Sequence, residues 1–244
     1  MIVINKLLLI SFISILGFSF VSCSSIDSNE QQSEEVFEFN FQESTYGWEP
    51  FFTNYPKEWD EKMELTSDYK SLPSPLDSTK NALFISAINH SDDVFMLFRR
   101  QINGLDANTT YRVEFTVEIA SEIPSNCYGI GGSPGEAVKV LTNASNLKPE
   151  RIFGSDNREY YVLNVQHEDD PIKWLANSII GNIANSRECE QDPEYELKEI
   201  STGPNHQTVT TDEEGRVWLL FGTRSGFEGQ TNLYYSHFKA SFKI

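Results

Sequence analysis

Residues 111–120 alternate between apolar and polar side chains, with the two-residue period of a β-strand that has one buried face. A continuous apolar run at residues 94–98 predicts a neighbouring strand buried on both faces. A polar turn at residues 104–109 separates the two segments. A slip of one residue would turn every apolar group of residues 111–120 outward, so the register is strongly specified. We predict a hairpin-like unit within an antiparallel β-sandwich.

Further strand patterns follow along the chain. Residues 206–222 predict a hairpin whose turn, residues 212–215, ends in a glycine suited to a positive φ. Residues 174–184 are compatible with a strand or a short helix, and Gly181 with the β-branched residues favours a strand. The last strand is predicted at residues 233–244, with one face formed by Tyr234, Ser236, Phe238, Ala240, Phe242 and Ile244. The other predicted strands are residues 36–41, 81–88, 137–141, 159–165 and 195–200.

Long helices and internal repeats are not evident in this pattern. Residues 49–69 read as irregular, and the two prolines within residues 72–76 exclude a central strand there. The glycine-rich residues 129–135 lack a following Gly-Lys-Ser/Thr, so we interpret them as a tight loop. We predict an all-β fold of roughly nine or ten strands in a single domain, residues 36–244.

Residues 1–22 have the features of an export signal. Lys6 precedes an apolar stretch, residues 7–21, which at about 15 residues is too short for a comfortable membrane span. The stretch ends in Phe20-Val21-Ser22-Cys23, which resembles a bacterial lipobox, in which the cysteine is acylated and becomes the mature N-terminus. The alternative is an ordinary cleaved signal. We expect a polar tether over residues 23–35 and anchoring to a bacterial membrane, the outer membrane, through Cys23.

Charge and cysteines limit the partners. The formal net charge is −17, and such a surface repels phosphate backbones, so we expect no nucleic-acid partner. Export places Cys127 and Cys189 in an oxidising compartment, where we predict a disulfide between them; two free thiols are the alternative. The spacings typical of zinc sites are absent from the sequence.

Three strings are relevant to the fold family. Gly47-Trp48 follows the first strand, Gly104-Leu105-x-x-Asn108-Thr109-x-Tyr111 precedes an alternating strand, and residues 229–234 lead into the last strand. Together they resemble the galactose-binding-like jelly roll, a fold shared by many carbohydrate-binding modules of secreted bacterial proteins. Residues 89–93 and 222–229 also resemble strings in uncharacterised bacterial lipoproteins, which supply no activity.

The resemblance implies a structural calcium ion that ties the first strand to the last. Glu38, Asn40 and Glu43 are the candidate oxygen ligands near the first strand. The aspartate that such modules commonly have in the last strand is missing, since residues 235–237 are Tyr-Ser-His. This departure puts the usual calcium position in doubt.

A second group of polar residues, 89–93, precedes the strand at residues 94–98. Asp92 and Asp93 could bind a cation such as calcium. Alternatively, Asn89 and Asp92 stabilise a turn through side-chain to backbone hydrogen bonds. Asn89 and Asp92 are also candidate ligand contacts, as are Arg224 and Glu228 in a later loop.

Aromatic residues in loop-like stretches are candidate sugar platforms, because exposed rings stack on the apolar faces of sugars. The candidates are Trp48, Tyr55, Trp59 and Trp174. The alternative is that each ring caps the hydrophobic core.

We expect a non-catalytic, lipid-anchored protein whose β-sandwich binds glycan or another extracellular ligand. One alternative is a surface lipoprotein for protein interaction or assembly that does not bind sugar. Another is a glycoside or ester hydrolase, although the many acids of the chain do not single out a catalytic pair.

Overall fold

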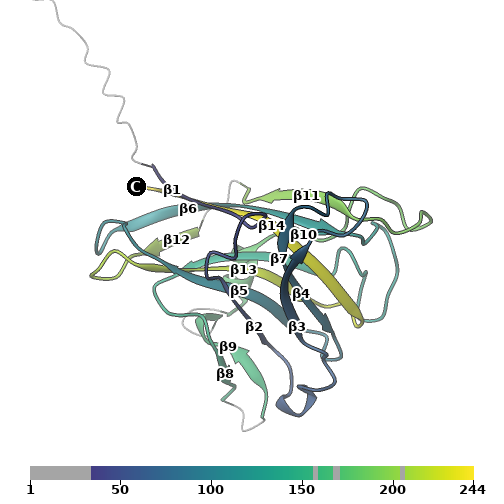
Figure 1. Cartoon of the computed structure of the whole chain (residues 1–244). Coiled ribbons are helices and arrows are strands. Elements are labelled where there is room, and N and C mark those ends of the chain that lie inside the picture. Colours follow the sequence, from purple (N-terminus) through teal and green to yellow (C-terminus); the bar gives the residue numbers. More distant parts are fainter. Residues whose placement is uncertain (1–33, 156–158, 167–170, 204–206) are drawn as a thin grey trace, which may run out of the picture. The chain divides into compact units, whose positions relative to one another are not determined.

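The computed structural model describes residues 34–155, 159–166, 171–203 and 207–244. These residues form a β-sandwich of antiparallel strands, which confirms the predicted fold class (Figure 1). The described residues hold fourteen strands rather than nine or ten, because several short edge strands lack an alternating pattern. The predicted signal peptide, Cys23 and most of the tether lie outside the described residues. Within the described part, no helix is long and apolar enough to cross a membrane.

Two sheets and a small hairpin make up the domain. Sheet A has the order β11-β6-β14-β4-β3, with β1 also paired to β14 and β12 to β6. Sheet B has the order β10-β7-β13-β5-β2. The strands of sheet A are β1 (Glu34–Asn40), β3 (Thr66–Ser71), β4 (Asn81–Ile88), β6 (Thr110–Ser121), β11 (Glu196–Ser201), β12 (Gln207–Thr210) and β14 (Gln230–Lys243). The strands of sheet B are β2 (Glu49–Thr53), β5 (Val94–Ile102), β7 (Val138–Ser145), β10 (Ile179–Asn182) and β13 (Val217–Ser225).

The remaining elements lie beside sheet B. Strands β8 (Arg151–Phe153) and β9 (Tyr161–Leu163) pair with each other and contact β2 (Figure 1). The helix α1 (Pro171–Ser178) contacts β7 and β10 at the other edge of that sheet. Short 3₁₀ turns occupy η1 (Lys57–Trp59) and η2 (Asn164–Gln166).

The main core lies between the two sheets and is strongly aromatic. Phe221 of β13 is fully buried at its centre. Its ring centroid lies 4.6 Å from that of Trp48, 4.8 Å from Phe238 and 4.9 Å from Tyr235. The alternation of residues 111–120 is confirmed, since the apolar side chains of β6 face this core.

Both predicted hairpins are wrong in the same way. β5 belongs to sheet B and β6 to sheet A, so the turn between them crosses from one sheet to the other. The same is true of β12 and β13. The two crossing turns pack on each other, with Asn108 N donating to Asp212 O at 3.1 Å and Leu105 N to Gly215 O at 3.3 Å. Alternation identifies a strand and its buried face, but both sheets present a buried face to the same core.

The predicted face of the last strand is also partly wrong. The pairing of β14 with β6 shifts register between Tyr235 and His237, which makes Ser236 an extra residue. Tyr235 and Phe238 therefore both face the core, while Tyr234 lies on the outer side of sheet A. The Ser236 hydroxyl donates to Glu118 Oε1 at 2.6 Å, so the bulge places a polar group beside a carboxylate.

Three segment predictions need smaller corrections. Strand β1 begins at Glu34, two residues before the predicted start. The stretch predicted to be irregular contains the edge strands β2 and β3. Residues 174–184, for which we favoured a strand, begin inside the helix α1 and continue as β10.

Candidate functional site

The outer face of sheet B is covered over part of its area. Its buried residues Phe95, Leu97, Leu141 and Leu220 pack beneath Leu163 and Val165, which follow from β9 into η2. Trp174 and Leu175 of α1 add to this second, smaller core. The covered residues include Phe95, which lies across from Arg224 near the end of β13.

The opposite end of this face holds a partly exposed tryptophan. Trp218 lies directly across from Gln101 of β5 on one side and from Ser145 of β7 on the other. Cross-strand partners project from the same face of a sheet, so the three side chains form a row. Gln101 is exposed, and Lys148 Nζ lies 5.6 Å from the centroid of the Trp218 ring.

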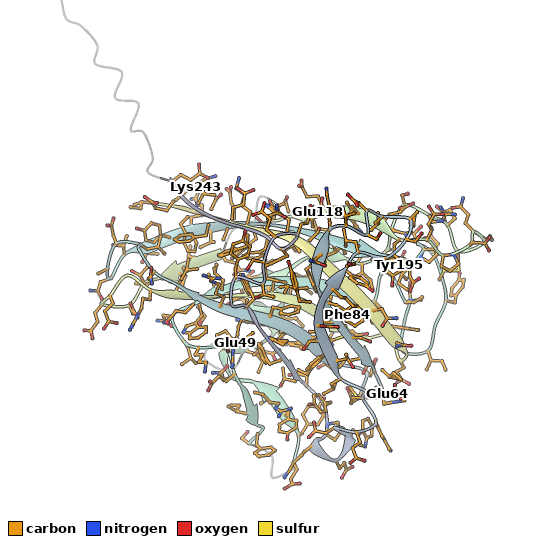
Figure 2. The ribbon with its side chains drawn as sticks, viewed as in Figure 1. Glu49, Glu64, Phe84, Glu118, Tyr195 and Lys243 are labelled. Atoms are coloured by element: carbon orange, nitrogen blue, oxygen red, sulfur yellow. A yellow bond between two sulfur atoms is a disulfide. The ribbon has the colours of Figure 1, made fainter. Side chains whose placement is uncertain are left out.

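A groove adjoins this row at the edge of sheet B. We call it the β2–β8 groove; its volume is about 470 Å³, and it is lined by Pro50, Phe51, Phe52, Arg99, Glu150 and Arg151. The Arg99 guanidinium carbon lies 5.1 Å from the centroid of the Phe51 ring. Figure 2 shows Glu49, the residue before Pro50, on the side of the domain where the β8–β9 hairpin lies.

Ion pairs hold the polar groups of the groove in place. Arg99 Nε donates to Glu49 Oε2 at 3.2 Å, and Lys148 Nζ lies 2.7 Å from Glu150 Oε1. The hydrogen bond from Lys148 is the main reason that the pKa of Glu150 is lowered. Since Lys148 also lies over Trp218, it connects the groove to the tryptophan row.

Two tyrosines hold the Arg151 side chain in place. Its Nη1 donates to the hydroxyl of Tyr55 at 2.7 Å, and its guanidinium carbon lies 4.0 Å from the centroid of Tyr161. Aromatic rings and fixed polar groups therefore share one concave surface.

Two of the predicted aromatic platforms are wrong. Trp48 is only 5% exposed and lies in the main core, and Tyr55 is fully buried. The Tyr55 hydroxyl donates to Asp60 Oδ1 at 2.7 Å, and burial raises the pKa of Tyr55 well above its usual range. Both residues follow strand ends in loop-like sequence, yet their rings fold back over the core.

The other two aromatic candidates are half-buried. Trp59 packs against the cluster that contains Tyr55 and Met63, with Lys62 Nζ 5.4 Å from its ring centroid. Trp174 packs on the outer face of sheet B from α1, at the edge opposite β2. Neither lines the β2–β8 groove. Whether either contacts a ligand stays a prediction.

The Asn89 side chain joins two loops through hydrogen bonds. It is 1% exposed, and its Nδ2 donates to the carbonyls of Ser225 and Phe227 at 2.9 and 2.8 Å. Its Oδ1 accepts from Ser91 N at 2.9 Å. All of these partners are internal, so the side chain serves the turn, as the alternative interpretation held, and is not placed to contact a ligand.

The remaining polar candidates gather around the same turn. Asp93 pairs with Arg224 and accepts from Asn54 Nδ2 at 3.2 Å, while burial raises the pKa of its carboxyl. Asp92 is exposed with φ +62°. A side chain built on Gly131 would come 3.0 Å from Glu228 Cγ and 3.2 Å from Asp92 Oδ1. Asp92 and Glu228 thus approach the same loop.

The predicted calcium ligands near β1 make local contacts. Asn40 Nδ2 donates to Glu43 Oε1 at 3.0 Å, and Glu38 Oε1 lies 2.8 Å from His237 Nε2. Within the described ranges, no three or more His, Cys, Asp or Glu side chains gather as a metal cluster. The calcium ion stays a prediction.

The predicted disulfide is confirmed. Cys127 and Cys189 are bonded, with their Cα atoms 5.0 Å apart. The bond joins the loop after β6 to the loop before β11.

Residues 131–135, Gly-Gly-Ser-Pro-Gly, match the Gly-x-Ser-x-Gly spacing of serine hydrolases. That motif needs a sharp turn from a strand into a helix, with a histidine beside the serine. Here the loop leads from β6 to β7, and the Ser133 hydroxyl donates to the Glu136 carboxylate. The described residues around Ser133 do not form a hydrolase elbow.

The sequence did not lead us to predict four residues of this surface as site residues. They are Trp218, Gln101, Arg99 and Phe51. The available signal was Trp218 itself, which stands between the inward residues Val217 and Leu219 and must therefore face outward. A large aromatic residue at an outward position of a strand indicates either a covering segment or a ligand.

Comparison with known proteins gives only distant likenesses. No family model matches the chain, and no curated protein matches it. An adhesin domain of Lys-gingipain from Porphyromonas gingivalis is 9% identical with a TM-score of 0.36, covering 84% of this chain and 97% of that one. A proposed sugar-binding protein from Bacteroides thetaiotaomicron is 14% identical with a TM-score of 0.36, covering 82% and 90%. The module TmCBM61, solved with β-1,4-galactotriose, is 12% identical with a TM-score of 0.34, covering 80% and 87%. We therefore draw function from this chain's own residues.

Proposed function

We propose that this domain is a non-catalytic module that binds neutral glycans through the Trp218 row and the β2–β8 groove. The observation that supports the proposal is that Trp218 and Phe51, two partly exposed rings, lie on one face of sheet B with fixed polar side chains between them. Sugars combine apolar C–H faces with hydroxyl groups. Aromatic rings suit the first, and the amide of Gln101 and the charges of Arg99 and Glu150 suit the second.

The preference for neutral glycans follows from charge. The chain has a net charge of −17, which disfavours acidic polysaccharides at long range. Arg99 of the groove is already paired with Glu49, and Glu150 of the groove with Lys148. They can therefore bind hydroxyl groups without needing a charged ligand.

The state of Glu150 supports binding rather than hydrolysis. A glycosidase needs a carboxylic acid with a raised pKa to protonate the leaving oxygen. Lys148 lowers the pKa of Glu150, so this carboxyl lacks the raised pKa of a glycosidase acid. The carboxylate of Glu49 is occupied by Arg99.

A panel of neutral oligosaccharides built from glucose, galactose, mannose or xylose tests this proposal. We expect Trp218→Ala to weaken binding at least about 10-fold, equivalent to about 1.4 kcal/mol, because a stacking surface is lost. Leu197→Ala is the control: it removes an exposed apolar side chain from β11 of sheet A and should leave affinity unchanged. Equal affinities for Trp218→Ala and the unmodified protein would rule out this site.

We also propose that the exported protein is anchored to the outer membrane through an acylated Cys23, the residue at the end of the lipobox-like segment. With Cys23→Ala, the protein should move from the membrane fraction to the soluble fraction, since two or more acyl chains are needed for stable attachment. Detergent partitioning of both forms measures this. Unchanged partitioning would count against a lipid anchor.

A further inference from the structure

The loop between β6 and β7 presents two large apolar side chains to solvent. Tyr128 is 101% exposed and Ile130 is 73% exposed. Most of the other aromatic rings belong to, or pack against, four buried clusters. Two large apolar side chains exposed close together on one loop are a candidate contact surface, because apolar groups left in water gain nothing from folding.

This loop is held rigidly on the β11 side. The disulfide joins Cys127, the neighbour of Tyr128, to Cys189. Ser125 N and Oγ both donate to Arg187 O at 2.8 Å, and Asn126 Nδ2 donates to Glu188 Oε2 at 2.8 Å. The backbone that carries the ring therefore loses little conformational entropy when a ligand binds.

The loop is held equally well from the β13 side. Glu228 N donates to Ile130 O at 2.8 Å. A Cβ on Gly129 would lie 2.6 Å from the Phe227 ring, so this glycine lets the backbone pack directly on that ring. The backbone at Tyr128 is thus held by contacts on both sides.

A hollow lies beside the ring. Its volume is about 430 Å³, and its lining consists of Asn126, Cys127, Tyr128, Gly129, Gly132, Ser133 and Glu136. Within the described part of the chain, the backbone N–H groups of Tyr128, Gly129 and Gly132 donate to no other residue. They are available as hydrogen-bond donors to a ligand.

A carboxylate faces the same hollow. Glu136 accepts from Asn126 N at 2.8 Å and from the Ser133 hydroxyl. Burial acts to raise the pKa of Glu136, but these hydrogen bonds outweigh it and lower the pKa. A fixed negative charge excludes anionic ligands and can accept hydrogen bonds from hydroxyl groups.

We propose that this hollow is a second glycan subsite, which takes one neutral sugar ring stacked on Tyr128. The ring's hydroxyl groups would accept from the free N–H groups and donate to Glu136. This inference rests on the proposed function, because it assigns a second place on the domain to the same class of ligand.

The two subsites lie at opposite ends of β13. Trp218 is near its start, while Gly226, just past its end, donates its N–H to Ala137 O at the base of the Tyr128 loop. Ser225 follows Trp218 by seven positions along the strand, or roughly 23 Å at 3.3 Å per residue. One chain long enough to span this distance could occupy both, and such linked binding would exceed either affinity alone.

An NMR titration separates the two subsites. The mature chain, made with Cys23→Ala so that it stays in solution, is titrated with the neutral oligosaccharide panel. The Trp218 indole N–H reports on the first subsite, and the amides of Gly129 and Gly132 report on the second. We expect both sets of signals to shift and saturate, and Tyr128→Ala to abolish the glycine shifts while the indole shift remains.

Ile130→Ala is the matched control, because it removes an exposed apolar side chain from the same loop without touching the ring. It should leave the glycine shifts intact. If only the indole responds, the second subsite is wrong and the proposed function stands. If only the glycines respond, the second subsite stands and the Trp218 site is wrong. If neither responds, both are wrong. Equal losses with Tyr128→Ala and Ile130→Ala would contradict the proposed stacking of a sugar on the Tyr128 ring.

Discussion

Phe221→Ala is expected to lower the free energy of unfolding by about 3–5 kcal/mol, the range for removing a large aromatic side chain from a well-packed core. Phe221 is fully buried between the two sheets. Besides the three nearest rings, Phe98 and Phe41 lie 5.4 and 5.7 Å from it, centroid to centroid. Five aromatic rings surround this position. Because such large, rigid side chains cannot readily repack into the space that Phe221 leaves, the cavity should remain largely open.

Urea denaturation at neutral pH measures this loss. Phe153→Ala is the matched control, because the Phe153 side chain is 52% exposed on β8. We expect the control to cost less than about 1 kcal/mol, as surface substitutions usually do. A Phe221→Ala loss no larger than that of the control would mean that the aromatic centre is not the main core.

Removal of the disulfide is expected to cause the second large loss in the free energy of unfolding. Cys127 and Cys189 are 62 residues apart, and closing a loop of that length restricts the unfolded chain by about 4 kcal/mol in the loop-entropy model. The double substitution Cys127→Ser, Cys189→Ser should therefore lower the free energy of unfolding by about 2–5 kcal/mol. The same experiment bears on the Tyr128 loop, which the bond braces.

A reducing agent provides the control for this prediction. It should destabilise the unmodified protein by a similar amount and leave the double variant unchanged. A double variant as stable as the unmodified protein would show that the neighbouring hydrogen bonds of Ser125 and Asn126 suffice to hold the loop.

The sequence predicts the strands well and their partners poorly. The alternation of residues 111–120 identifies β6 and its buried face, because a strand between core and solvent must alternate. It does not say that β5 lies in the other sheet, since two facing sheets share one core. The bulge at Ser236 is likewise hidden, because one extra residue reverses the faces without leaving a local signal.

The aromatic residues show how far the candidate site could be predicted from the sequence. Trp48 stands in loop-like sequence but is buried, whereas Trp218 stands in a strand but is partly exposed. Burial depends on which segments return to cover a face, and α1 with η2 covers only part of sheet B. The local sequence pattern does not show which distant segments will cover a face of a sheet. The outward position of Trp218 is readable, and it is the better signal.

The most direct test of glycan binding on the open face of sheet B is a crystal structure of the mature chain with the neutral oligosaccharide that it binds most tightly. We predict density for a sugar ring against Trp218, with hydroxyl groups within hydrogen-bond distance of Gln101 or of the polar side chains of the β2–β8 groove. A well-defined glycan bound elsewhere, with Trp218 and the groove holding only water, would contradict the proposed site.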